Sequence, residues 1–160
     1  MLLDTGAFNN LVGDKWVARM DDLNRKHGKP THTTTTLSRK ITLGGVGTGT
    51  QETNKAVQVP CSVHGQPVNF SATVLDNSDI PAILGMKTMQ DRHGILDLRN
   101  KRLIFPEKPE DVKITVANNT KIYQLTQAPG GYFMLPCSPG TEALVKPQDY
   151  LYHKTSDISK

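Results

Sequence analysis

The sequence predicts an all-β fold with one or two short helices. Turn-forming residues are frequent, with 13 Gly and 10 Pro among 160 residues. Between them lie short runs in which apolar and polar residues alternate, the pattern of strands with one buried face. Hydrophobic residues make up 36% of the chain, which permits a modest core. The length fits one domain, or one domain with an appendage.

The first third of the chain predicts two strands and a helix. Residues 2–13 read as a short strand, a glycine turn and a second strand. Residues 14–26 predict a helix, with Asp14 as its N-cap and Gly28 at its end. Residues 31–36, mostly Thr, are interpreted as a polar spacer. The helix is expected to pack through one face, formed by Trp16, Val17, Met20 and Leu23.

The rest of the chain predicts mostly strands. The segment Ile80–Gly85 reads as an apolar strand ended by its glycine, and Met86–His93 as about two helical turns. After Pro106 the pattern changes to two or three short strands separated by Asn-Asn and Pro-Gly-Gly turns. Strands and hairpins are expected at residues 40–47, at 55–65 and 68–76 with a turn at His64–Pro67, and at 95–105.

Composition argues against several classes of function. The net charge is +4 and the basic residues are scattered, so no specific nucleic-acid partner is predicted. No apolar run approaches the roughly 20 residues that span a bilayer, and no signal peptide is visible, so a cytoplasmic location is the default. The five His residues lack metal-ligand spacing, and no metal or other cofactor is expected. Cys61 is expected to be a buried thiol; a disulfide with Cys137 would require secretion.

Three segments together point to chemistry: Leu2–Ala7, Gly44–Gly49 and Ile80–Gly85. Each alone has an ordinary explanation. Asp beside Gly usually marks a turn, and an apolar triplet before Gly usually ends a core strand. The glycine-rich run could bind phosphate, but Thr50 stands where the dinucleotide fingerprint needs a third Gly. The significance of these segments lies in their combination.

In this order, the three segments resemble the retroviral-type aspartic proteases, the retropepsins. The resemblance runs from Leu2 to Phe105 and includes "ATVLDNSDIPAILGMKTM" and "GILDLRNKRLIF". The phrase "GGVGTGTQ" is typical of retrotransposon members. The resemblance implies an acid-protease half-barrel over residues 1–105. Residues 106–160 would then be a C-terminal extension or a polyprotein linker with short strands.

The resemblance implies an aspartic endopeptidase that cleaves extended polypeptides, its own polyprotein included. Two carboxylates about 3 Å apart share one proton; one activates water and the other donates to the scissile carbonyl. The chain has one such residue, Asp4. The second must come from another copy, so activity would require a homodimer.

Neighbouring residues acquire roles by the same resemblance. Thr5 would hydrogen-bond across the dimer axis, Gly6 would give its N–H to the carboxylate, and Ala7 would line the substrate cleft. Leu84 and Gly85 would pack beneath the catalytic loop. The substrate-binding flap would be formed by Gly45, Val46 and Gly47.

One departure from the family keeps alternatives open. Retropepsins carry a longer segment before the catalytic triplet, whereas only three residues precede Asp4. We expect an N-terminally truncated chain, either a fragment of a polyprotein, a shortened gene product or a decayed retroelement. The alternative function is a catalytically inactive relic or protein-interaction domain with the same fold. Two further rivals are a ubiquitin-associated shuttle protease of the same family, for which no ubiquitin-like domain is visible, and a basic nucleic-acid binder.

Overall fold

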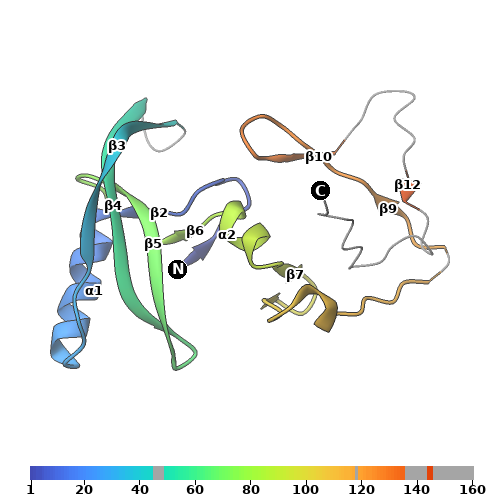
Figure 1. The fold of residues 1–160 in the computed structure, drawn as a ribbon, viewed down its shortest axis with the longest axis horizontal. Coiled ribbons are helices and arrows are strands. Elements are labelled where there is room, and N and C mark those ends of the chain that lie inside the picture. The colour runs from blue at the N-terminus through green and yellow to red at the C-terminus, as the bar shows by residue number, and fades with distance from the viewer. Residues whose placement is uncertain (45–48, 118, 136–143, 146–160) are drawn as a thin grey trace, which may run out of the picture. The chain divides into compact units, whose positions relative to one another are not determined.

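The computed structural model describes residues 1–44, 49–117, 119–135 and 144–145. The chain divides into two compact units, Met1–Thr88 (unit 1) and Met89–Lys160 (unit 2). Figure 1 labels their helices and strands. The described elements are mostly strands with two short α-helices, which confirms the predicted all-β class.

Unit 1 is built on one six-stranded sheet, and its strand order determines where the loop that contains Asp4 lies. A two-residue strand near the start of the chain runs parallel to another that comes about 80 residues later, with Leu2 opposite Ile83. The spatial order is β1 (Leu2–Leu3), β6 (Ile83–Leu84), β2 (Leu11–Gly13), β5 (Gln66–Leu75), β4 (Thr50–Val63) and β3 (Thr33–Gly44).

Strand β6 therefore separates β1 from β2. It pairs parallel with β1 and antiparallel with β2, where Leu11 lies opposite Ile83. The chain between β1 and β2 must pass across the end of β6 to join them. Residues 4–10 form this connection and are called the catalytic loop below because they include Asp4, the predicted catalytic residue.

Strands β3, β4 and β5 form an antiparallel meander that supplies most of the sheet (Figure 1). The predicted turn between β4 and β5 is confirmed, with positive φ angles at His64 (48°) and Gly65 (81°). The predicted polar spacer is wrong, because β3 already begins at Thr33 and pairs with β4. A run of β-branched Thr suits an exposed edge strand, where neither face has to be apolar.

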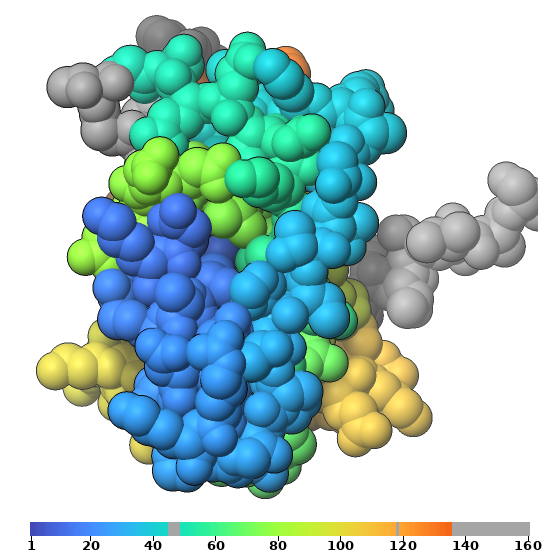
Figure 2. All heavy atoms as spheres, turned by 90° about the vertical axis from the view of Figure 1, so that its left-hand side faces the viewer, coloured from blue at the N-terminus to red at the C-terminus, as the bar shows by residue number. Residues whose placement is uncertain are grey.

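Helix α1 (Asp14–Lys26) has the predicted bounds, but two details differ. Leu23 is 48% exposed, while Asn24 is buried and donates its side-chain N–H to the Pro60 carbonyl oxygen. The N-cap is Gly13, because the Asp14 side chain binds another loop instead of its own helix. The space-filling view shows α1 (blue) and β3 (cyan) side by side on one face of unit 1 (Figure 2).

The core of unit 1 lies between α1 and the sheet. Val12, Val59 and Leu75 are almost completely buried. Trp16 of α1 packs edge-on against Phe70 of β5, with ring centroids 6.4 Å apart. Burial of these side chains fixes α1 against the sheet, since each buried aliphatic or aromatic side chain contributes about 1.5–3 kcal/mol.

The second helix, α2 (Met86–Asp91), ends two residues earlier than predicted. In unit 2, the expected hairpin of β7 (Ile95–Asp97) and β8 (Arg102–Ile104) is confirmed. A 3-10 turn, η1 (Pro109–Asp111), follows it. The remaining strands of unit 2 form two small antiparallel pairs: β9 (Ile122–Tyr123) with β12 (Leu144–Val145), and β10 (Thr126–Gln127) with β11 (Phe133–Met134).

Candidate active site

Asp4 lies directly after β1, where the catalytic loop begins. The Leu2 N–H donates to the Ala82 carbonyl oxygen at 2.7 Å, and the Asp4 N–H donates to the Leu84 carbonyl oxygen at 3.2 Å. These bonds extend the β1–β6 pairing as far as Asp4. The backbone of Asp4 is therefore held by the sheet even though β1 itself has only two residues.

The Asp4 carboxylate is oriented by the turn that follows it. The Gly6 N–H donates to Asp4 Oδ1, with 2.8 Å between nitrogen and oxygen. The Ala7 N–H donates to the Asp4 carbonyl oxygen at 3.4 Å. A Cβ at position 6 would lie 3.1 Å from Asp4 Oδ1, so glycine permits the close approach that this bond needs. Thr5 is exposed and Ala7 is half-buried.

The second half of the catalytic loop is attached to the start of α2. The Met86 N–H donates to the Ala7 carbonyl oxygen at 2.8 Å, and the Lys87 N–H donates to that of Phe8 at 2.9 Å. The first N–H groups of a helix have no partner within the helix, and here the catalytic loop provides acceptors for two of them.

Gly85 is buried directly under this loop. A Cβ there would lie 2.5 Å from the carbonyl oxygen of Asn9, which is backbone and cannot rotate away. The close packing agrees with the supporting role that the resemblance gave to Gly85. Its N–H donates to the side chain of Asn10, a residue that sequence reasoning missed. A single Asn in a loop carries no pattern that would have identified it.

The predicted flap residues Gly45, Val46 and Gly47 lie outside the described residues. The residues on either side are described: Gly44 at the end of β3 is paired with Thr50 at the start of β4. The predicted flap residues therefore lie, in the sequence, between two strands that are paired antiparallel.

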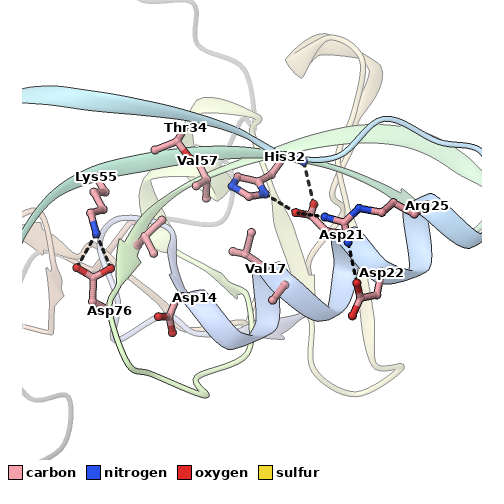
Figure 3. Close-up of a pocket in the computed structure, with 12 residues that line it drawn as sticks. Asp14, Val17, Asp21, Asp22, Arg25, His32, Thr34, Lys55, Val57 and Asp76 are labelled. Carbon is pink, nitrogen blue, oxygen red and sulfur yellow. Dashed lines mark hydrogen bonds and ion pairs between the residues drawn. The ribbon is translucent and has the colours of Figure 1, made fainter.

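A second polar region of unit 1 is a hollow of about 280 Å³ between α1 and the sheet (Figure 3). His32 Nδ1 lies 2.6 Å from Oδ2 of the buried Asp21, and Asp21 Oδ1 accepts the His32 N–H at 2.9 Å. Lys55 donates to both carboxylate oxygens of Asp76, each at 2.9 Å. A third ion pair joins Arg25 to Asp22.

The remaining carboxylate of this hollow, Asp14, accepts the backbone N–H groups of Asn77 and Ser78 at 2.9 and 3.0 Å. The bond from Asn77 is the largest cause that lowers the pKa of Asp14 below its ordinary value. Every carboxylate lining the hollow thus has a partner within the protein. The bonds of Asp14 and Asp21 join α1 to neighbouring segments of unit 1.

Other chemistry finds little support in the described part of the chain. No group of three or more His, Cys, Asp or Glu residues there could hold a metal ion. No helix among these residues is both long and apolar enough to cross a membrane. Cys61 is half-buried, and burial raises the pKa of its thiol, which reduces the thiolate fraction and hence its reactivity.

Comparison with known proteins gives matches among solved structures alone: no family model matches the chain, and no curated protein does. One similar structure is the retroviral protease-like domain of Ddi1 from Leishmania major, at 19% identity and a TM-score of 0.43. The match covers 66% of this chain and 77% of that one. Another is EIAV protease complexed with the inhibitor HBY-793, at 28% identity and a TM-score of 0.38, covering 61% of this chain and 80% of that one. One of these two structures is a retroviral protease-like domain and the other is a retroviral protease.

Proposed function

We propose that this protein is an aspartic endopeptidase of the retrotransposon type, which cleaves extended polypeptides as a homodimer. The observation that carries the proposal is the fixed carboxylate of Asp4, which lies in a turn held by the sheet and accepts the Gly6 N–H. The sequence places it in Asp-Thr-Gly-Ala, and that tetrapeptide occurs once.

The position of the Asp4 oxygens suits activation of water. Oδ1 accepts the Gly6 N–H, whereas within the described residues Oδ2 accepts no hydrogen bond. Asp4 is also half-buried and not fully enclosed. Oδ2 is thus free to meet water, substrate or a second carboxylate. In the proposed mechanism, one ionised and one protonated Asp4, from two copies, activate the water and protonate the scissile carbonyl oxygen.

Neighbouring residues complete the proposed site. Exposed Thr5 is free to hydrogen-bond to the partner subunit's loop, and Ala7 contributes a small apolar surface to the substrate cleft. We assign Gly45, Val46 and Gly47 to a flap that covers the substrate. A bound peptide in extended conformation would use backbone hydrogen bonds, with its side chains in alternating pockets.

The test is a peptide-library cleavage assay at mildly acidic and neutral pH, with pepstatin as inhibitor, together with analytical ultracentrifugation. We expect pepstatin-sensitive cleavage whose specific activity falls on dilution as dimers dissociate. Asp4→Asn should lower kcat by about 10³-fold or more, because general acid–base catalysis is lost. Asp22→Asn is a matched control at an exposed carboxylate of α1 and should retain activity.

The variant results also discriminate against the alternatives. Full activity in Asp4→Asn would contradict the assignment of Asp4. A stable monomer without cleavage of any library peptide would contradict the protease proposal and favour a non-catalytic domain of the same fold.

A further inference from the structure

We propose that Asn10 is a positioning residue, which holds the catalytic loop in the conformation that aligns Asp4. The inference rests on the proposed protease function and adds a residue to its machinery. Asn10 ends the catalytic loop, six positions after Asp4 and immediately before β2.

The side chain of Asn10 joins the loop to three other places in unit 1. Its Oδ1 accepts the Gly85 N–H at 2.8 Å and the Thr88 hydroxyl at 3.0 Å. Its Nδ2 donates to the Ser71 carbonyl oxygen at 2.9 Å. In addition, its backbone carbonyl oxygen accepts the Thr73 N–H at 3.1 Å. One side chain therefore connects β5, the end of β6 and the first turn of α2.

The partners fix which end of the amide is oxygen. Gly85 N–H can only donate, and the Ser71 carbonyl can only accept. Rotation of the amide by 180° would place N–H against N–H and oxygen against oxygen, losing both bonds. A side chain of the same shape cannot replace Asn here unless it also carries a donor and an acceptor at the same positions.

These bonds act on Asp4 through short backbone connections. Gly85 follows Leu84, whose carbonyl oxygen accepts the Asp4 N–H. Between Asp4 and Asn10, the Ala7 carbonyl oxygen accepts the N–H of Met86, the first residue of α2. Loss of the Asn10 bonds would leave the loop attached by fewer points on both sides of the carboxylate. A displacement of about 1 Å in a catalytic group can cost 10²-fold in rate.

The amide also performs this role without adding a charge to the catalytic loop. A carboxylate at position 10 would add a negative charge to the loop that contains Asp4, and like charges disfavour ionisation. A neutral donor–acceptor group positions the loop and leaves the proton shared by the two Asp4 residues undisturbed.

Kinetics of Asn10→Ala provide the first test. We expect kcat for a cleavable peptide to fall about 10²-fold with KM changed less than threefold, because alignment is lost and peptide contacts are kept. Asn69→Ala is the matched control, since Asn69 is an exposed amide on β5, the strand that contains Ser71, and its loss should leave both constants unchanged. Equal kcat in Asn10→Ala and the natural protein would overturn the proposal.

Asn10→Asp gives a sharper, pH-dependent test in a variant of the same shape. Ionised, the new carboxyl keeps the acceptor for Gly85 but repels the Ser71 carbonyl oxygen; protonated, it regains a donor. We therefore expect the ratio of its kcat to that of the natural protein to rise as pH falls. A ratio independent of pH would contradict the role assigned to the donor.

Amide hydrogen exchange separates this inference from the protease proposal. At a temperature where far-UV circular dichroism shows Asn10→Ala to be folded, the Gly6 and Gly85 amides should exchange at least tenfold faster than in the natural protein. Amides of β4 should be unchanged. If the natural protein cleaves nothing, the protease proposal fails while the exchange rates still decide whether Asn10 holds the loop; unchanged rates would overturn its role.

Discussion

Unit 1 contains two polar networks beside the same sheet, and they use different chemistry. Around the catalytic loop the bonds are neutral: the Asn10 amide, backbone N–H groups and a Thr hydroxyl. Beside α1 the bonds involve charged side chains: Asp22 pairs with Arg25 within the helix, Lys55 of β4 pairs with Asp76, and the Asp21 carboxylate bonds to the backbone and ring of His32. The charged side chains of the second network line the hollow between α1 and the sheet (Figure 3).

The difference agrees with whether a carboxylate in each region has to remain available for chemistry. Under the proposed function, Asp4 would share a proton with its symmetry mate and would need surroundings without competing charges, because a nearby charge changes which form is favoured. Beside α1 no group has to remain reactive, so charges can neutralise one another. The contrast also predicts different sensitivities: close packing should dominate near Asp4, and acidity and salt should matter beside α1.

The largest effect on stability is expected for Gly85→Ala. The new Cβ would meet the Asn9 backbone at 2.5 Å, and forcing the loop away should cost about 3 kcal/mol, the upper range for over-packing. Urea denaturation measures the loss. Gly44→Ala is the control, because a Cβ there meets nothing within 4 Å. Equal stability of the two variants would show that the loop is not packed as described.

A smaller loss is expected for Asp21→Ala in the network beside α1. Asp21 is buried and accepts two hydrogen bonds from His32, so its removal leaves partly buried donors unsatisfied, at about 2 kcal/mol. Asp22→Ala, at an exposed carboxylate of the same helix, should change stability by less than about 0.5 kcal/mol. Similar thermal shifts for both variants would contradict the burial of the Asp21–His32 pair.

Acidification should weaken the hydrogen bonds that the Asp14 carboxylate accepts from the backbone N–H groups of Asn77 and Ser78. The pKa of Asp14 is lowered in the folded state, first by the Asn77 backbone N–H. Its stabilising contribution is therefore present above the ordinary value of 3.8 and is lost as pH falls through the lower folded pKa. Chemical denaturation of Asp14→Asn across this range should show a smaller loss of stability on acidification than the natural protein. Parallel pH curves for the two proteins would exclude this linkage.

The smallest effect is expected at the exposed pair of Lys55 and Asp76, whose side chains are about half exposed. Lys55→Met should lower the free energy of unfolding by about 0.5 kcal/mol at low salt. In about 1 M NaCl, where screening acts within about 3 Å, the difference from the natural protein should shrink. A loss that is larger and insensitive to salt would contradict the description of Lys55 and Asp76 as an exposed, screened ion pair.

Local sequence patterns determined many of the secondary-structure elements of this protein. Alternation identified the strands β4 and β5, the spacing of Trp16, Val17 and Met20 identified α1, and the Gly in Asp-Thr-Gly-Ala predicted the turn after β1. These succeed because a turn, a helix face or a strand face depends on residues close together in the chain. The same reasoning failed at Thr33–Thr36, since an edge strand gains its pairing from β4 and needs no apolar face of its own.

Contacts between distant segments were decided by the tertiary structure alone. The insertion of β6 between β1 and β2, the binding of Asp14 to a loop 63 residues away, and the bonds of Asn10 to Ser71, Gly85 and Thr88 have no local signature. The physical reason is that a polar side chain has several possible partners of similar energy. Only the path of the folded backbone brings one set within hydrogen-bond distance.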